Sequence, residues 1–104
     1  MPRRKKLKAE QYHSTLAQML GVYIRESRLA QKKTQQDIIK RLGFSVQFYG
    51  RIENGTVMAP QDALSKLVKE LGLDYGRVLK IFKAAAVDEV ESIFRSSKKS
   101  RASK

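Results

Sequence analysis

Gln47 and Arg51 lie four residues apart, a spacing that puts both side chains on one face of a helix. Glutamine can form two hydrogen bonds with the edge of an adenine, and arginine can do the same with O6 and N7 of a guanine or grip a phosphate. Val46, on the same face, could pack on a thymine methyl group. An ordinary solvated helix face carries such residues too, so residue type and spacing alone are weak evidence for contact with base edges.

Two short helices joined by a tight turn are predicted to position this face. Thr34 can cap the first helix, with Asp37 three residues further on, in an arrangement close to a capping box. Gly43 suits a left-handed helix end, Ser45 can cap the second helix, and Gly55 ends it. The apolar residues of the pair are Ile38, Ile39, Leu42, Tyr49 and Ile52. Helices this short bury little alone, and their pairing leaves one face of the second helix free, as in a helix-turn-helix reader of the major groove.

The segment from about Leu20 to Leu79 resembles the lambda-repressor-like, Cro-type (XRE) helix-turn-helix family. The matching motifs are Ile24-Arg25-Glu26-Ser27-Arg28, Thr34-Gln35-Gln36-Asp37-Ile38, Leu42-Gly43-Phe44-Ser45, Arg51-Ile52-Glu53-Asn54-Gly55, Pro60, Leu67-Val68-Lys69-Glu70-Leu71-Gly72-Leu73 and Val78-Leu79. They cover more than half of the chain, in order. The resemblance implies an all-α, five-helix, lambda-repressor-like domain that binds DNA, and the sequence adds an appended C-terminal helix and basic tails. A small helical bundle without DNA contact is the plain alternative, since a fold does not fix a function.

The resemblance also assigns roles to individual residues. Those expected at the DNA are Gln35, Gln36, Val46, Gln47, Gly50, Arg51, Asn54 and Thr56. Gln35 would hold a phosphate through its backbone N–H and side chain, and Gln36 would contact the backbone or a base edge. Asn54 matches a position at which family members touch phosphate, and Thr56 lies beside it. Arg28 and Glu53 match a structural ion pair that locks the motif.

Three residues depart from the family pattern. Gly50 stands in mid-helix where a polar side chain is usual, and either lets the helix approach DNA closely or marks weakened base readout. Phe48 is bulky and is expected as an exposed apolar contact for DNA or a protein. Ile39 replaces a smaller residue at the crossing of the two helices.

Four segments are predicted along the chain: a disordered basic arm at 1–9, the helix-turn-helix DNA-binding domain at 10–82, an appended amphipathic helix at 83–95 and a basic tail at 96–104. The first helix is expected to run from about Glu10 or Ser14 to Gln31. Pro60 suits the first turn of a fourth helix, and Asp74 can cap a fifth. A break near Ala86 is left open, because Asp88 could cap a new helix.

The appended helix has an apolar stripe that needs a partner: Phe82, Ala86, Val90 and Ile93. A homodimer contact is the favoured interpretation, because helix-turn-helix repressors commonly match two-fold operators. The stripe could instead fold back on its own domain, or bind a different protein.

The net charge of +12 is concentrated at the two ends. Residues 1–8 and residues 95–104 each carry five basic side chains and no acid, so the ends hold ten of the twelve net charges. They suit arms that follow DNA phosphates, although a solvated tail that aids solubility has the same composition, and RNA or an anionic membrane would attract them too.

Several kinds of function are not supported by the composition. The chain has no Cys, so a disulfide or a thiolate metal site is impossible, and its one His, His13, reads as a surface residue. No catalytic set, cofactor motif or metal cluster is visible, so the chain is not expected to be an enzyme. No apolar run could span a membrane, and the basic start lacks the apolar core of a secretory signal. A cytoplasmic protein, on the nucleoid when bound, is expected.

The sequence therefore predicts a sequence-specific DNA-binding transcriptional regulator of bacterial or phage type. Two alternatives stay open. One is an antitoxin-like protein-interaction module of a toxin–antitoxin pair, using the C-terminal helix and Phe48. The other is a sequence-tolerant nucleic-acid binder driven by the basic tails.

Overall fold

The structure, a computed structural model, describes residues 8–102, with the side chains of residues 15–88, 90, 91 and 93. Five helices follow one another: α1 (Lys8–Ala30), α2 (Gln35–Leu42), α3 (Val46–Glu53), α4 (Gln61–Leu71) and α5 (Tyr75–Ala102). The described part contains no strand, so the predicted all-α class is confirmed. Most of the predicted arm at 1–9 lies outside the described residues, and its last two, Lys8 and Ala9, belong to α1.

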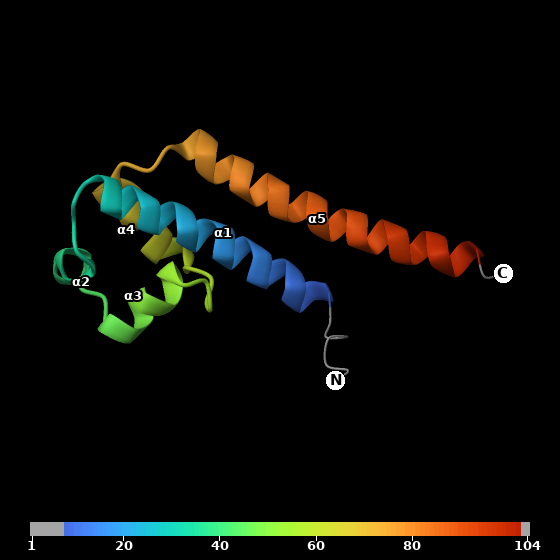
Figure 1. The fold of residues 1–104 in the computed structure, drawn as a ribbon, viewed down its shortest axis with the longest axis horizontal. Coiled ribbons are helices and arrows are strands. Elements are labelled where there is room, and N and C mark those ends of the chain that lie inside the picture. The colour runs from blue at the N-terminus through green and yellow to red at the C-terminus, as the bar shows by residue number, and fades with distance from the viewer. Residues whose placement is uncertain (1–7, 103–104) are drawn as a thin grey trace.

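The two long helices, α1 and α5, run side by side in opposite directions (Figure 1). The short helices α2 and α3 lie together beside α1, away from the C-terminal end of α5 (Figure 1). Because α1 packs on α3 and α4 as well as on α5, it is the central support of the molecule.

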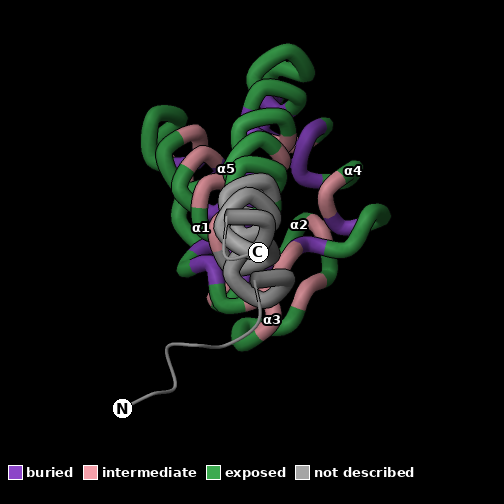
Figure 2. Tube along the Cα trace, turned by 90° about the vertical axis from the view of Figure 1, so that its right-hand side faces the viewer, coloured by how far each residue is buried: buried purple, intermediate pink, exposed green. Residues whose placement is uncertain are grey.

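The core lies where the five helices converge, and each contributes one apolar face to it (Figure 2). The largest fully buried side chains are Tyr49, Leu20, Ile24, Ile38, Ile52 and Leu67. On α5, the buried residues are Val78, Ile81 and Ala85, which recur every three or four residues and so share one face. This face packs the first half of α5 onto its own domain.

α1 and α3 approach each other closely at Gly21. A Cβ atom at this residue would lie 2.6 Å from the backbone carbonyl oxygens of Ile52 and Glu53, closer than any side-chain carbon can come. Since both obstructing atoms belong to the backbone, a larger residue would have to push the helices apart. Gly21 therefore sets the distance between α1 and α3.

The predicted caps of α2 and α3 are present. The Thr34 hydroxyl accepts from the backbone N–H of Asp37 at 3.0 Å, and the Asp37 carboxylate accepts from that of Thr34 at 2.8 Å, which completes a capping box. Gly43 ends α2 at φ +72°, and the Ser45 hydroxyl accepts from the backbone N–H of Phe48 at 3.1 Å to open α3. These contacts satisfy backbone groups that helix ends otherwise leave open, so they define the turn between the two helices.

α5 is one unbroken helix of 28 residues. The break left open near Ala86 does not occur, because no Gly or Pro follows Gly76 and the run Ala84–Ala86 favours helix strongly. The helix also continues through residues 96–102, a segment predicted as tail. The predicted fifth helix, the appended helix and most of the tail are thus one element.

The apolar stripe predicted on α5 divides into two parts. Phe82 is half-buried and packs against the core, whereas Val90 and Ile93 are 61% and 53% exposed. Leu79 and Val87, in the first half of the helix, are exposed as well. The distal half of α5 therefore carries apolar side chains that the domain does not cover.

Candidate nucleic-acid interface

The outward face of α3 carries the side chains expected to read DNA. Val46 is 61% exposed, Gln47 and Arg51 are exposed, and Asn54 and Thr56 are exposed just beyond the helix end. The opposite face of α3 holds Tyr49 and Ile52 in the core. The structure thus places the predicted residues together on one free surface.

Gly50 lies half-buried in the middle of this face. A Cβ atom added there would meet no other atom within 4 Å, so packing within the protein does not require glycine at this position. The missing side chain leaves open space on the surface of α3.

Arg28 and Glu53 form the predicted ion pair. Arg28 Nε lies 2.6 Å from Glu53 Oε2, and Arg28 Nη2 donates to Glu53 Oε1 at 3.1 Å. Arg28 Nη1 also donates to the backbone carbonyl of Lys33 at 2.8 Å, in the link between α1 and α2. With both residues less than a tenth exposed, this bidentate pair joins α1, the α1–α2 link and the end of α3.

The electrostatics of the pair keep both partners charged. The hydrogen bond to Glu53 raises the pKa of Arg28. Burial tends to raise the pKa of Glu53, but the hydrogen bonds from Arg28 and Gln35 contribute to a net lowering below the usual 4.5. Beside them, the fully buried Tyr49 hydroxyl makes no hydrogen bond with the described residues, and burial raises the pKa of Tyr49 well above its usual range.

The side chain of Gln35 does not point freely outwards. Its Nε2 donates to Glu53 Oε1 at 2.9 Å, so the amide that was expected at a phosphate takes part in the ion-pair network. The backbone N–H of Gln35 lies in the first turn of α2, where helices have no internal acceptor. Gln36, its neighbour, is exposed.

Asn54 and Thr56 form a small network at the end of α3. Asn54 Oδ1 accepts from the backbone N–H of Thr56 at 3.3 Å, and the Thr56 hydroxyl lies 2.9 Å from the same oxygen. The Asn54 side-chain oxygen is therefore occupied by Thr56, which leaves the amide N–H₂ available as a donor.

Phe48 differs from its prediction. It is half-buried rather than exposed, and its ring packs edge-to-face on Phe44, with centroids 5.3 Å apart. Phe44 in turn stacks on Tyr49. The sequence shows only that Phe48 is bulky; the loop residue Phe44, which turns back onto α3, provides its partner. Phe48 thus extends the core instead of offering a free docking group.

A polar pocket of about 370 Å³ opens between α1, α2 and α3. It is lined by Arg25, Arg28, Gln35, Gly50, Glu53 and Asn54. Arg25 was not among the residues predicted at the interface. The available signal was its position three residues before Arg28, one turn earlier on α1, because the family resemblance pairs Arg28 with Glu53 at the end of α3.

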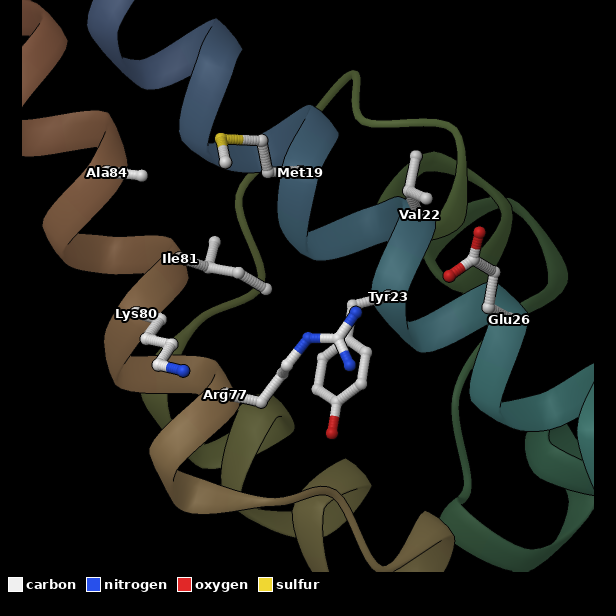
Figure 3. Close-up of a pocket in the computed structure, with 8 residues that line it drawn as sticks. All are labelled: Met19, Val22, Tyr23, Glu26, Arg77, Lys80, Ile81 and Ala84. Carbon is white, nitrogen blue, oxygen red and sulfur yellow. The ribbon is translucent and has the colours of Figure 1, made fainter.

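A second, apolar groove separates α1 from α5 (Figure 3). Its volume is about 460 Å³, with Met19 and Val22 on the α1 side and Ile81 and Ala84 on the α5 side. The Arg77 guanidinium lies over the Tyr23 ring, 4.9 Å from its centroid. This groove shares no residue with the outward face of α3 or with the polar pocket.

Two negative findings concern the described residues only. They include no group of three or more His, Cys, Asp or Glu side chains that could hold a metal ion. They also include no helix with the length and apolar character needed to span a bilayer.

The two capped helices, their tight turn and the exposed outer face of α3 define a helix-turn-helix protein. A family model described as Helix-turn-helix matches residues 24–78, which is more than half of the chain. The chain therefore belongs to this lambda-repressor-like (XRE) family of DNA-binding regulators. No curated protein and no solved structure matches it.

Proposed function

We propose that this chain is a sequence-specific DNA-binding transcriptional regulator that places α3 in the major groove. The observation that carries the proposal is the division of α3 into two faces. Tyr49 and Ile52 are buried, whereas Gln47 and Arg51 project from the other side. The Arg28–Glu53 pair fixes the end of α3 against α1, so the reading face is held in a defined orientation. As a regulator it would act in the cytoplasm, on the nucleoid when bound.

Selection of bound sites from random duplex DNA tests this proposal directly. A sequence-specific regulator should enrich a short motif, and the enriched duplex should bind far more tightly than a scrambled duplex of equal length and charge. Equal affinity for both duplexes would instead support sequence-tolerant binding driven by the basic tails.

We also propose that the protein works as a homodimer through the distal half of α5. Val90 and Ile93, on this half, are apolar side chains that the domain leaves uncovered. Such groups favour association, and two-fold pairing would present two α3 helices to half-sites about 34 Å apart, or a multiple of that distance.

The same surface supports a second candidate, an antitoxin-like protein that uses α5 to bind a different protein. Phe48 no longer adds to this candidate because it packs on Phe44. Sedimentation separates the two ideas. A homodimer forms with the purified chain alone, whereas a protein-interaction module gives a larger, mixed complex once its partner is added.

A further inference from the structure

The apolar groove between α1 and α5 has the size of a small-molecule site. Its volume of about 460 Å³ lies in the range of roughly 300–1,000 Å³ that is typical of ligand pockets. Apolar side chains from both helices form most of its lining: Met19, Val22, Ile81 and Ala84. Val22 is 53% exposed, so the domain leaves this surface uncovered. The groove can therefore accept the apolar body of a small molecule.

An arginine is held at the end of the groove nearer the start of α5. The Arg77 side chain reaches from α5 towards α1, with its guanidinium 4.9 Å from the centroid of the Tyr23 ring (Figure 3). The Tyr23 hydroxyl accepts a hydrogen bond from the backbone N–H of Asp74 at 2.9 Å, which fixes the ring. Because a cation is attracted to an aromatic face, the ring in turn positions the guanidinium.

The positive charge at this end is not balanced within the groove. Lys80 follows Arg77 by one turn on the same side of α5 and also lines the groove. Among the described residues, neither cation lies within ion-pair distance of a carboxylate. Glu26 is the one acid in the lining, so the cations outnumber it. An apolar groove with unpaired cations at one end suits a molecule that is apolar along its length and negatively charged at its tip.

We propose that this groove binds a small amphipathic carboxylate, with the carboxylate on Arg77 and Lys80 and the apolar body directed along the groove towards Ala84. A guanidinium suits a carboxylate because it can donate two parallel hydrogen bonds to it. Ala84 has the smallest side chain of the lining and leaves room for the apolar end. The seven residues from Arg77 to Ala84 rise by about 10 Å, close to the length of an extended eight-carbon chain. This site lies apart from the outer face of α3 and does not depend on DNA binding.

Methionine labelling tests the site directly, because Met19 lines the groove and the other methionines, Met1 and Met58, do not. The chain is labelled with ¹³C at its methionine methyl groups and titrated with octanoate, while NMR follows the three signals. Octanoate should shift the Met19 signal until one ligand is bound per chain and should leave the Met58 signal in place. Acetate, which lacks the apolar body, and 1-octanol, which lacks the charge, should each bind roughly ten-fold or more weakly.

Two variants separate the contribution of the charge from that of the space. Arg77→Gln should weaken octanoate binding roughly ten-fold but should leave the weak binding of 1-octanol unchanged. Ala84→Leu fills the apolar part and should weaken the binding of both probes; position 84 is exposed and leucine favours helix, so the fold is retained. Lys83→Gln removes an exposed charge from α5 outside the groove and is the matched control, which should bind octanoate like the wild type.

Three results would overturn the proposal. The first is a Met19 signal that octanoate does not shift, or octanoate binding that survives both Arg77→Gln and Ala84→Leu. The second is an equal loss in Arg77→Gln and Lys83→Gln, which would mean that octanoate merely follows the net positive charge of the chain. The third is a Met19 signal that moves with protein concentration, together with a larger mass in sedimentation, and to which octanoate adds no further shift. In that case a second copy of the chain occupies the groove.

Discussion

Arg28 and Glu53, 25 residues apart in the sequence, meet through a 2.6 Å contact in the interior of the protein. The contact ties the last turn of α1 to the last residue of α3. Arg28 therefore links α1 to α3, although it lies outside the two helices of the motif.

The first prediction concerns the energy of this pair. Glu53→Ala should lower the free energy of unfolding by about 3 kcal/mol or more, because it leaves the Arg28 guanidinium buried without its charge partner. Urea denaturation followed by circular dichroism measures the change. Glu26→Ala, at an exposed position on α1, is the control and should stay close to wild type; equal stability of Glu53→Ala and wild type would argue against the pair.

The second prediction concerns the stability of the protein at acid pH. The folded-state pKa of Glu53 lies below its usual 4.5, so the unfolded chain takes up the proton first as the pH falls. The stability from this group is therefore complete above about pH 4.5 and is lost as the pH falls through the lower folded value. Unfolding free energies between pH 7 and pH 3 should show this decline, and Glu53→Gln should show a smaller one. If the unfolding free energies of wild type and Glu53→Gln declined in parallel with pH, Glu53 would not be the source of the decline.

The third prediction concerns base readout. Arg51→Ala should cost roughly 1–3 kcal/mol on the preferred duplex and should relax the preference at one base position. Binding measurements on the preferred duplex and on single-base variants provide the test. An equal loss on random DNA would make Arg51 a phosphate contact instead.

The fourth prediction concerns the basic ends. Replacing the bases of residues 1–8 with Gln should weaken binding to all duplexes alike and should reduce the salt slope by about 0.9 for each DNA phosphate that the protein no longer neutralises. The same change at Lys98, Lys99, Arg101 and Lys104 tests the other end without shortening α5. An unchanged slope would mean that the replaced bases do not touch DNA.

The fifth prediction concerns association. Val90→Glu combined with Ile93→Glu should turn the proposed dimer into a monomer, because both side chains are exposed on α5 and their replacement leaves the domain core intact. Sedimentation velocity provides the measurement, with Lys83→Glu as a control for charge on the same helix. A wild type that is monomeric both in solution and on DNA would contradict the proposed dimer. A double variant that stays dimeric would show that the interface lies elsewhere on the protein.

Much of the motif could be predicted because its signals are local. The caps at Thr34 and Ser45 and the left-handed turn at Gly43 depend on residues within four positions of one another, and the structure confirms each. The Arg28–Glu53 contact was predicted instead from the family resemblance, because no local pattern indicates that residues 25 positions apart meet.

The features that the sequence could not supply depend on packing. Whether Phe48 is free or covered depends on where the loop residue Phe44 turns, and the amide of Gln35 is drawn to Glu53 only once α2 and α3 are paired. The continuity of α5 was undecided because Asp88 is compatible with either a cap or an interior position. Arg25 reaches the interface solely through the placement of α1 beside α3.

Positions 21 and 50 are both glycine, but the space around them differs: a side chain fits at position 50 and does not fit at position 21. At position 21 two backbone oxygens stand 2.6 Å from where a side chain would begin, whereas at position 50 no atom stands within 4 Å. A side chain at position 21 would therefore force α1 and α3 apart, whatever the protein binds. Position 50 is open to the fold, so a substitution there changes the outer surface of α3 without disturbing the packing beneath it.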